Sequence, residues 1–198
     1  GGALRVVCPD VAGRGRSDWL KDPMGYAIPN YAADMLQMLG QLHAAAPVRT
    51  LDWVGTSMGG LIGMGLAGMP NLPLPVPFRR LVLNDVGPVI QWQALQRIGT
   101  YLGQTGRFES VQQAADAMWQ ISQGFGPHTP AQWLALSQPM VKSLPEGGVT
   151  LHYDPAIAIP FGSATQESTA QGEQMLWTLY DNSRAATLLV RGAQSDLL

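Results

Sequence analysis

Residues 55–59, Gly-Thr-Ser-Met-Gly, join a short apolar run to a long stretch of small and apolar residues. The run 50–54 predicts a β-strand, and the stretch from Ser57 or Met58 to Met69 predicts a helix packed in an interior. A chain that passes from strand to helix through so few residues must turn sharply. The constraint puts Ser57 at the corner and requires a fold in which strands feed directly into helices.

These five residues fit the G-x-S-x-G pattern of a nucleophile elbow, in which a serine hydroxyl is held clear of the sheet. We expect Gly55 and Gly59 to lack Cβ atoms that would collide with neighbouring backbone. The N–H of Met58, at the start of the helix, is the expected first oxyanion donor. The alternative is that Ser57 merely caps a glycine-rich packing helix. The strand before it and the helix after it favour the elbow.

The rest of the chain alternates strands and helices, which predicts an α/β fold with a mostly parallel sheet, helices on both faces and an inserted helical block. Patterns of apolar residues predict strands at 4–8, 79–87 and 187–192, a helix at Tyr31–Leu42, helices without a strand in 88–145, and irregular chain in 146–170. We therefore expect a core in 1–87, a helical cap in 88–180, and a return to the core in 181–198.

Several segments resemble successive landmarks of the α/β-hydrolase superfamily, in particular bacterial members with a helical cap. They are CPDVAGRGRSDWL, VGTSMGGLIGM, RRLVLNDVGPVI, LHYDPAIA and LLVRGAQSDLL, in the family's order. The resemblance implies that Ser57 is the nucleophile and that Asp196 is the acid that orients a catalytic histidine. Asp85, at the end of another strand, is the second candidate for the acid, because some relatives carry theirs there. Met58 matches the oxyanion donor.

Two further regions receive roles from the resemblance. The turn with Asp10, Gly13, Gly15 and Ser17 matches the family's loop after its fourth strand, and we interpret these residues as structural. The block 88–180 matches the cap that covers the pocket. Its tryptophans could line an apolar pocket, but at helical spacing such residues more often form ordinary core; they are Trp92, Trp119 and Trp133.

A serine hydroxyl needs a histidine to take its proton, and in this family the histidine follows the acid. Only two residues follow Asp196, and the three histidines, His43, His128 and His152, all precede it. The family's earlier strands, with the loop that supplies a second oxyanion donor, also have no counterpart. We therefore expect this chain to be an internal piece of a longer hydrolase and to be close to inactive by itself.

Composition narrows the possible partners. Charged residues make up 13% of the chain, against about 25% in ordinary soluble domains, and the net charge of −2 gives no basic surface for nucleic acid. No run of apolar residues is long enough to cross a bilayer, and no cluster has metal-ligand spacing. Cys8, the single cysteine, is expected to be buried in a strand, and a cytoplasmic, reducing location fits it.

The leading hypothesis is a serine hydrolase without a cofactor, acting on a small apolar ester, lactone or related carbonyl compound. A second hypothesis is hydrolysis of carbon–carbon bonds, or acyl transfer, on the same residues, because fold and triad do not separate these reactions. A third is a non-catalytic binding protein that has lost its histidine. A small molecule is the expected partner in the first two, and the sequence gives no oligomeric state.

Overall fold

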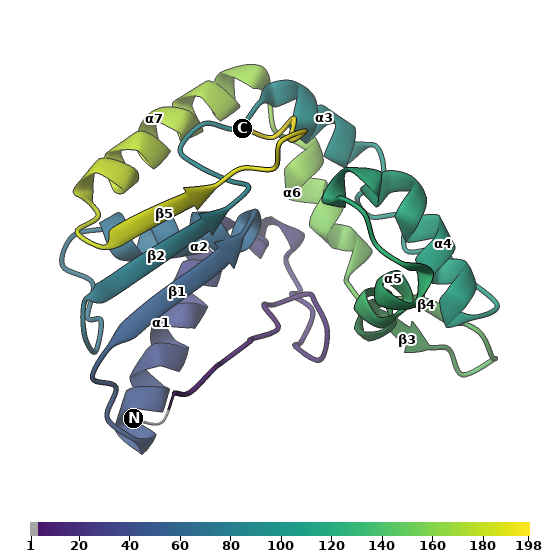
Figure 1. Ribbon diagram of the computed structural model, residues 1–198, viewed down its shortest axis with the longest axis horizontal. Helices are drawn as coiled ribbons and strands as arrows, with labels where there is room; N and C mark the ends of the chain where they lie inside the picture. The colour runs from purple at the N-terminus through teal and green to yellow at the C-terminus, as the bar shows by residue number, and fades with distance from the viewer. Residues whose placement is uncertain (1–3) are drawn as a thin grey trace. The chain divides into compact units, whose positions relative to one another are not determined.

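The computed structural model describes residues 4–198 and has an α/β architecture with parallel strands (Figure 1), which confirms the expected fold class. The α-helices are α1 (Ile28–Ala45), α2 (Met58–Gly68), α3 (Trp92–Gly99), α4 (Val111–Ser122), α5 (Pro130–Ser137), α6 (Ala158–Gly162) and α7 (Gln166–Asn182). The strands are β1 (Leu51–Thr56), β2 (Phe78–Asn84), β3 (Val141–Ser143), β4 (Val149–Leu151) and β5 (Ala186–Val190). Short 3-10 helices are η1 (Pro23–Gly25), η2 (Gln123–Phe125), η3 (Gln138–Met140) and η4 (Pro155–Ile157).

The chain divides into two compact units. One, the sheet unit, consists of Pro23–Leu102 and Ile157–Leu198. The other, the hairpin unit, consists of Gly1–Asp22 and Gly103–Ala156, of which residues 1–3 lie outside the described part. The block 88–180 expected as a cap contributes to both units, so the cap boundaries stay a prediction.

The sheet unit is built on a parallel sheet in the order β1-β2-β5. Apolar side chains dominate β1 and β2, as expected for strands with helices packed against them. The register pairs Val54 with Val82, and Val82 with Leu188. A fork between the guanidinium of Arg79 and the carboxylate of Asp52 ties the N-terminal halves of β1 and β2 together, with Nε–Oδ1 at 2.8 Å.

Helix α2 packs on one face of this sheet and forms the centre of the core. Met64, Leu81, Leu83 and Val86 are all 1% exposed or less, and Leu176 and Tyr180 of α7 pack against them. Small residues let the elements approach closely, since a Cβ added at Gly68 would lie 1.8 Å from the carbonyl oxygen of Leu179 in α7. The glycines of α2 therefore set the spacing between α2 and α7.

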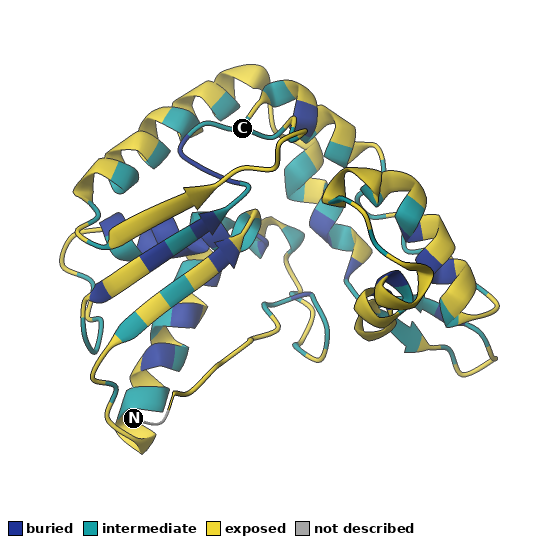
Figure 2. Cartoon of the chain, viewed as in Figure 1, coloured by how far each residue is buried: buried dark blue, intermediate teal, exposed yellow. Residues whose placement is uncertain are grey.

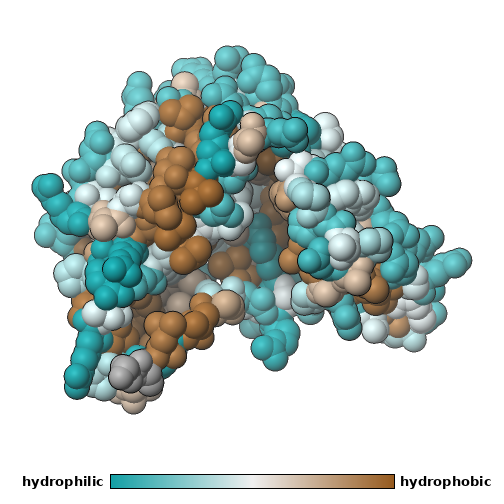
Figure 3. All heavy atoms as spheres, viewed as in Figure 1, coloured by the Kyte–Doolittle hydropathy of each residue, from teal (hydrophilic) through white to brown (hydrophobic). Residues whose placement is uncertain are grey.

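The opposite face of the sheet carries apolar side chains that remain exposed to solvent. Val54 is 73% exposed, Leu188 58% and Val190 41%. The strands are coloured accordingly in Figure 2, and apolar atoms gather over them in Figure 3. Because alternate residues point to opposite faces, α2 and α7 leave these three side chains uncovered.

The hairpin unit has a smaller core of its own. Helices α4 and α5 pack together around Ala115, Met118 and Trp133, and β3 pairs antiparallel with β4. The sequence patterns missed both strands: β3 lies in 88–145, which was expected to be without strand, and β4 in 146–170, which was expected to be irregular. Strands of three residues are too short to show a two-residue alternation, so periodicity cannot reveal them.

The strand expected at 4–8 is not formed, and that prediction is wrong. Residues 4–8 pair with no other strand among the described residues, and Leu4 and Val6 are 85% and 78% exposed. Cys8 is exposed as well, contrary to the expectation of a buried strand residue. An apolar, β-branched run favours a strand only where a neighbouring strand accepts its hydrogen bonds, and this segment has none in residues 4–198.

The approach of α2 to α7 can be tested with alanine at two positions of α2. We expect Gly68→Ala to lower the free energy of unfolding by about 1–3 kcal/mol or more, because its Cβ would overlap the backbone of Leu179. Gly65→Ala is the matched control, since a Cβ there would meet nothing within 4 Å. The control should stabilise the protein by up to about 1 kcal/mol through helix propensity. Urea unfolding measures both, and equal effects would contradict the packing argument.

Candidate active site

Ser57 occupies a strained corner between β1 and α2. Its backbone has φ 49° and ψ −120°, a conformation that residues with a side chain rarely adopt. The Ser57 N–H donates to the Asn84 carbonyl at 3.1 Å, and the Ser57 carbonyl accepts from Gly60 N–H at 2.8 Å and Leu61 N–H at 3.2 Å. These bonds fix the corner to β2 on one side and to α2 on the other.

The side chain of Ser57 does not act as a helix cap. Ser57 stands at the N-cap position of α2, but its hydroxyl makes no capping hydrogen bond, and its backbone is outside the extended region typical of such caps. The residue is exposed. Of the two interpretations of the Gly-Thr-Ser-Met-Gly segment, this geometry favours the nucleophile elbow.

The glycines around Ser57 differ in what they allow. A Cβ at Gly55 would lie 2.3 Å from the carbonyl carbon and oxygen of Gly59, as the elbow requires. The same expectation is wrong for Gly59, where a Cβ would meet nothing within 4 Å. The second tight position is Gly60, where a Cβ would lie 2.3 Å from Cγ1 of Val86. The motif's spacing missed Gly60, because only the packing of α2 on the sheet shows that it must be small.

Met58 is the first residue of α2, directly after Ser57. Its backbone N–H therefore belongs to the first turn of the helix, where the helix dipole favours negative charge. This is the position expected of an oxyanion donor.

The two candidate acids follow the strands that continue the sheet from β1. Asp85 follows β2 directly, and Asp196 lies in the loop after β5. Because β1, β2 and β5 are parallel, their carboxyl ends meet at one edge of the sheet. This is the edge at which open α/β sheets bind their ligands. Ser57, Asp85 and Asp196 therefore all belong to segments that leave the sheet at the same edge.

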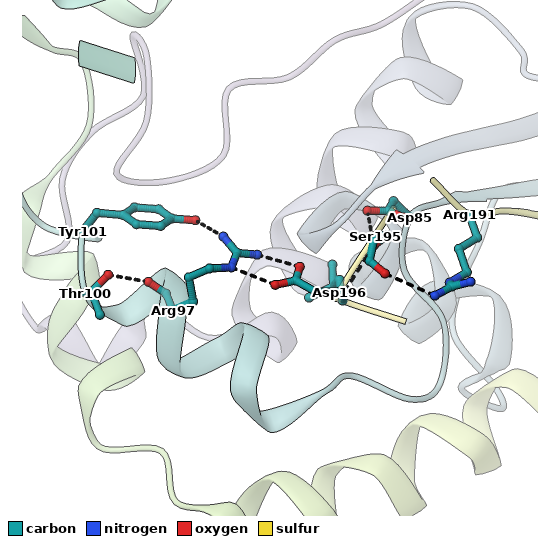
Figure 4. A network of polar contacts seen from close by, with 8 residues as sticks. Asp85, Arg97, Thr100, Tyr101, Arg191, Ser195 and Asp196 are labelled. Atoms are coloured by element: carbon teal, nitrogen blue, oxygen red, sulfur yellow. Dashed lines mark hydrogen bonds and ion pairs between the residues drawn. The ribbon is translucent and has the colours of Figure 1, made fainter. Parts of the chain in front are cut away.

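Asp196 forms a two-pronged ion pair with Arg97 of α3 (Figure 4). The distances are 2.8 Å from Nε to Oδ2 and 2.7 Å from Nη2 to Oδ1. The side-chain hydrogen bonds from Arg97 hold the pKa of Asp196 below its ordinary value, and Asp196 in turn raises the pKa of Arg97. Asp196 is therefore a carboxylate throughout the neutral range, although its side chain is 57% exposed.

Asp85 is bound to the loop that follows β5. Its Oδ1 accepts from Gly192 N–H at 3.0 Å, and its Oδ2 accepts from the Ser195 hydroxyl at 2.9 Å. Its backbone has φ 54°, so Asp85 is the second residue with a side chain to adopt a left-handed conformation at this edge. The two candidate acids are thus connected through one loop rather than being separate features.

The three histidines make contacts elsewhere. His43 Nδ1 accepts from Val48 N–H at 3.2 Å beside the end of α1. His128 and His152 belong to the hairpin unit, and the ring of His128 lies 5.7 Å from that of Trp133. Within residues 4–198, no hydrogen bond joins a histidine to Ser57, Asp85 or Asp196.

The turn that contains Asp10 has the contacts of a structural loop. Asp10 Oδ2 accepts from Arg16 N–H at 3.1 Å, and the Ser17 hydroxyl donates to the Asp10 carbonyl at 2.6 Å. Gly13 and Gly15 have φ of 80° and 54°, and a Cβ at Gly15 would lie 2.4 Å from Cγ of Asp10. These observations agree with the structural role expected for the turn.

The tryptophans expected in the cap fall in different surroundings. Trp119 and Trp133 contact each other with ring centroids 4.9 Å apart, and Trp133 Nε1 donates to the Ala115 carbonyl at 2.7 Å. They form core of the hairpin unit, in line with the alternative that the sequence favoured. Trp92 begins α3 in the sheet unit.

Two searches of the described chain returned nothing. Residues 4–198 contain no group of three or more His, Cys, Asp or Glu side chains able to hold a metal ion. Among the same residues, no helix combines the length and the apolar character needed to span a membrane.

The geometry of the corner predicts unequal effects of alanine at the two motif glycines. Gly55→Ala should lower the free energy of unfolding by about 1–3 kcal/mol or more, because the new Cβ would overlap the backbone of Gly59. Gly59→Ala should change it by less than about 1 kcal/mol, since the space is open. Urea unfolding of both variants measures this, and a Gly59→Ala variant as unstable as Gly55→Ala would contradict the geometry.

The Arg97–Asp196 ion pair predicts a pH-dependent stability difference. Because the folded-state pKa of Asp196 is lowered, the pair stabilises the fold above the ordinary carboxyl pKa and loses its effect as pH falls through the lowered value. Arg97→Met, which retains the apolar stem, should reduce the free energy of unfolding by at most about 1 kcal/mol at pH 7, since the pair is exposed. The difference from wild type should vanish near pH 3. A difference that persists at pH 3 would mean that Arg97 stabilises by packing.

Comparisons with known proteins place this architecture. Residues 3–148 match the family model described as the alpha/beta hydrolase fold. A 3-hydroxybutyrate-oligomer hydrolase from Cupriavidus necator is 48% identical over 202 residues, which is 100% of this chain and 66% of that protein. The chain therefore spans less than two thirds of this curated relative.

Two solved structures are similar in fold. One, from Rickettsia typhi, is 28% identical with a TM-score of 0.72 over 90% of this chain and 56% of the other. The second is an alpha/beta hydrolase from Novosphingobium aromaticivorans, 29% identical with a TM-score of 0.66 over 93% of this chain and 71% of the other. The family model, the curated hydrolase and the parallel sheet with its strand-to-helix corner agree: this chain is a hydrolase of the α/β-hydrolase fold family.

Proposed function

We propose that this protein hydrolyses ester bonds through an acyl-enzyme on Ser57. The observation that carries the proposal is the strained corner at Ser57, whose hydroxyl makes no helix cap and whose residue is exposed. Strained conformations persist at active sites because the surrounding structure holds them there. A serine in this geometry, at the carboxyl end of a parallel strand, is the arrangement in which the family's nucleophile works.

In the proposed reaction, Ser57 Oγ attacks the ester carbonyl carbon while a histidine takes the hydroxyl proton. The carbonyl oxygen becomes negative and accepts a hydrogen bond from Met58 N–H at the start of α2. When the intermediate collapses, the C–O bond of the ester breaks and the leaving alcohol receives the proton from the histidine. Water then attacks the acyl-Ser57 ester by the same route and releases the acid.

We assign Asp196 as the acid that orients the histidine. Arg97 holds the pKa of Asp196 below its ordinary value, so the group remains an acceptor for an imidazole N–H at any pH where the enzyme works. Asp85 is less suited to that task, because both of its oxygens already accept hydrogen bonds from the β5 loop.

We further propose short oligomers of 3-hydroxybutyrate as the substrate class. The support is the 48% identical relative from Cupriavidus necator, whose name states that it hydrolyses such oligomers. These compounds are small aliphatic esters, which agrees with the small apolar ester expected from the sequence. We propose a cytoplasmic site of action, where the exposed thiol of Cys8 would stay reduced.

The test compares the protein from its complete reading frame with its Ser57→Ala variant, using dimers and trimers of 3-hydroxybutyrate. We expect Ser57→Ala to lower kcat by up to about a million-fold, as loss of a serine nucleophile does. A fluorophosphonate probe should label the peptide that contains Ser57. Ser163→Ala is the matched control, because Ser163 is exposed and its hydroxyl only donates to the Pro160 carbonyl. Undiminished hydrolysis by Ser57→Ala, or labelling of another serine, would contradict the proposal.

A further inference from the structure

One carboxylate organises the loop that carries Asp196 (Figure 4). Asp85 accepts from Gly192 N–H through Oδ1 and from the Ser195 hydroxyl through Oδ2, at 3.0 and 2.9 Å. Ser195 Oγ also accepts from Leu197 N–H at 3.1 Å. The residues on both sides of Asp196 are therefore held by Asp85, Ser195 directly and Leu197 through the Ser195 hydroxyl.

The turn itself is closed by its own backbone. Ser195 N–H donates to the Gly192 carbonyl at 3.0 Å, so residues 192–195 form a compact turn. Asp85 accepts from the first and the last residue of that turn. This geometry binds the turn at both ends to a single side chain on the neighbouring strand.

Asp85 is itself fixed in place. Its backbone N–H donates to the Val190 carbonyl at 2.7 Å, one residue beyond the last pair of the β2–β5 ladder, Asn84 with Val190. Its φ of 54° is strained for a residue with a side chain and aims the chain out of the strand direction. The carboxylate is thus attached to the rigid end of the sheet, and the loop is attached to the carboxylate.

We propose that Asp85 is a positioning residue, which acts through Ser195 to fix the loop that presents Asp196. This inference rests on the proposed function, in which Asp196 orients the histidine. A carboxylate that is displaced by about 1 Å can cost a hundredfold in rate, because catalysis depends on exact orientation. Asp85 therefore affects catalysis without touching the substrate, and its contribution belongs to kcat rather than to KM.

The conservative variant Asp85→Asn separates positioning from direct action. An asparagine can accept from Gly192 N–H through its oxygen and donate to Ser195 Oγ through its amide, so both attachments survive. We expect Asp85→Asn to retain kcat within about tenfold, and Asp85→Ala to lower it about 10- to 100-fold with little change in KM. Asp196→Asn should lose about 10⁴-fold, the effect of disabling the acid of a serine triad.

Ser195→Ala tests the route of the effect. It removes the hydroxyl that joins Asp85 to Leu197, while the carboxylate and the Gly192 contact stay. We expect kcat to fall, and the double variant Asp85→Ala/Ser195→Ala to be no slower than Asp85→Ala, because the two residues act as one unit. Fully additive losses would overturn the route through Ser195.

Amide hydrogen exchange gives a readout that does not depend on activity. In the protein from the complete reading frame, Asp85→Ala should speed exchange at Gly192 and Leu197, Ser195→Ala should speed it at Leu197, and Asp85→Asn should leave Gly192 protected. Unchanged exchange in Asp85→Ala and Ser195→Ala would overturn the positioning role. A loss in Asp85→Asn as large as in Asp196→Asn would also overturn it and make Asp85 the orienting acid. If the wild type does not hydrolyse the oligomers, the proposed function fails, while exchange still decides the role of Asp85.

Discussion

The backbone of Ser57 is the constraint on which the rest of the sheet unit depends. Its left-handed conformation is unfavourable for a residue with a side chain, by about 1–3 kcal/mol. It is maintained because its N–H reaches across to β2 and its carbonyl caps the first turn of α2. Gly55 makes this possible, since any side chain there would push the start of α2 off the end of β1. The direction of α2, and with it the packing on the sheet, follows from this one corner.

A second strained residue stands at the end of the neighbouring strand. Asp85 has almost the same φ as Ser57, and both follow adjacent parallel strands. At each position the chain leaves the sheet abruptly, and at each a polar side chain is presented at the carboxyl edge. The loop after β5 is then bound by Asp85 and its acid by Arg97. Strain and hydrogen bonding are concentrated where the proposed chemistry takes place, while the buried centre of the unit is apolar.

The sequence predicted the elements that carry their own signal and missed those defined by partners. The strand before Ser57, the helix after it and the strand before Asp85 all have clear apolar patterns and were expected. The strand at 4–8 was wrong because an apolar run without a neighbour does not form one. Arg97 and Ser195 could not have been found, because Arg97 meets Asp196 from 99 residues away and a lone serine in a loop has no pattern. Gly60 was missed because its need for a small residue comes from Val86, on another element.

The close contact of Gly68 with the backbone of Leu179 has a consequence on the other side of the sheet's edge. Helix α7 ends at Asn182, and four residues later the chain enters β5, whose last residue receives the N–H of Asp85. The depth to which α7 settles onto α2 therefore limits where β5 can begin and how far its terminal loop extends. A glycine with no functional group, in the buried layer behind the strands, thus takes part in aligning the carboxylates at their tips.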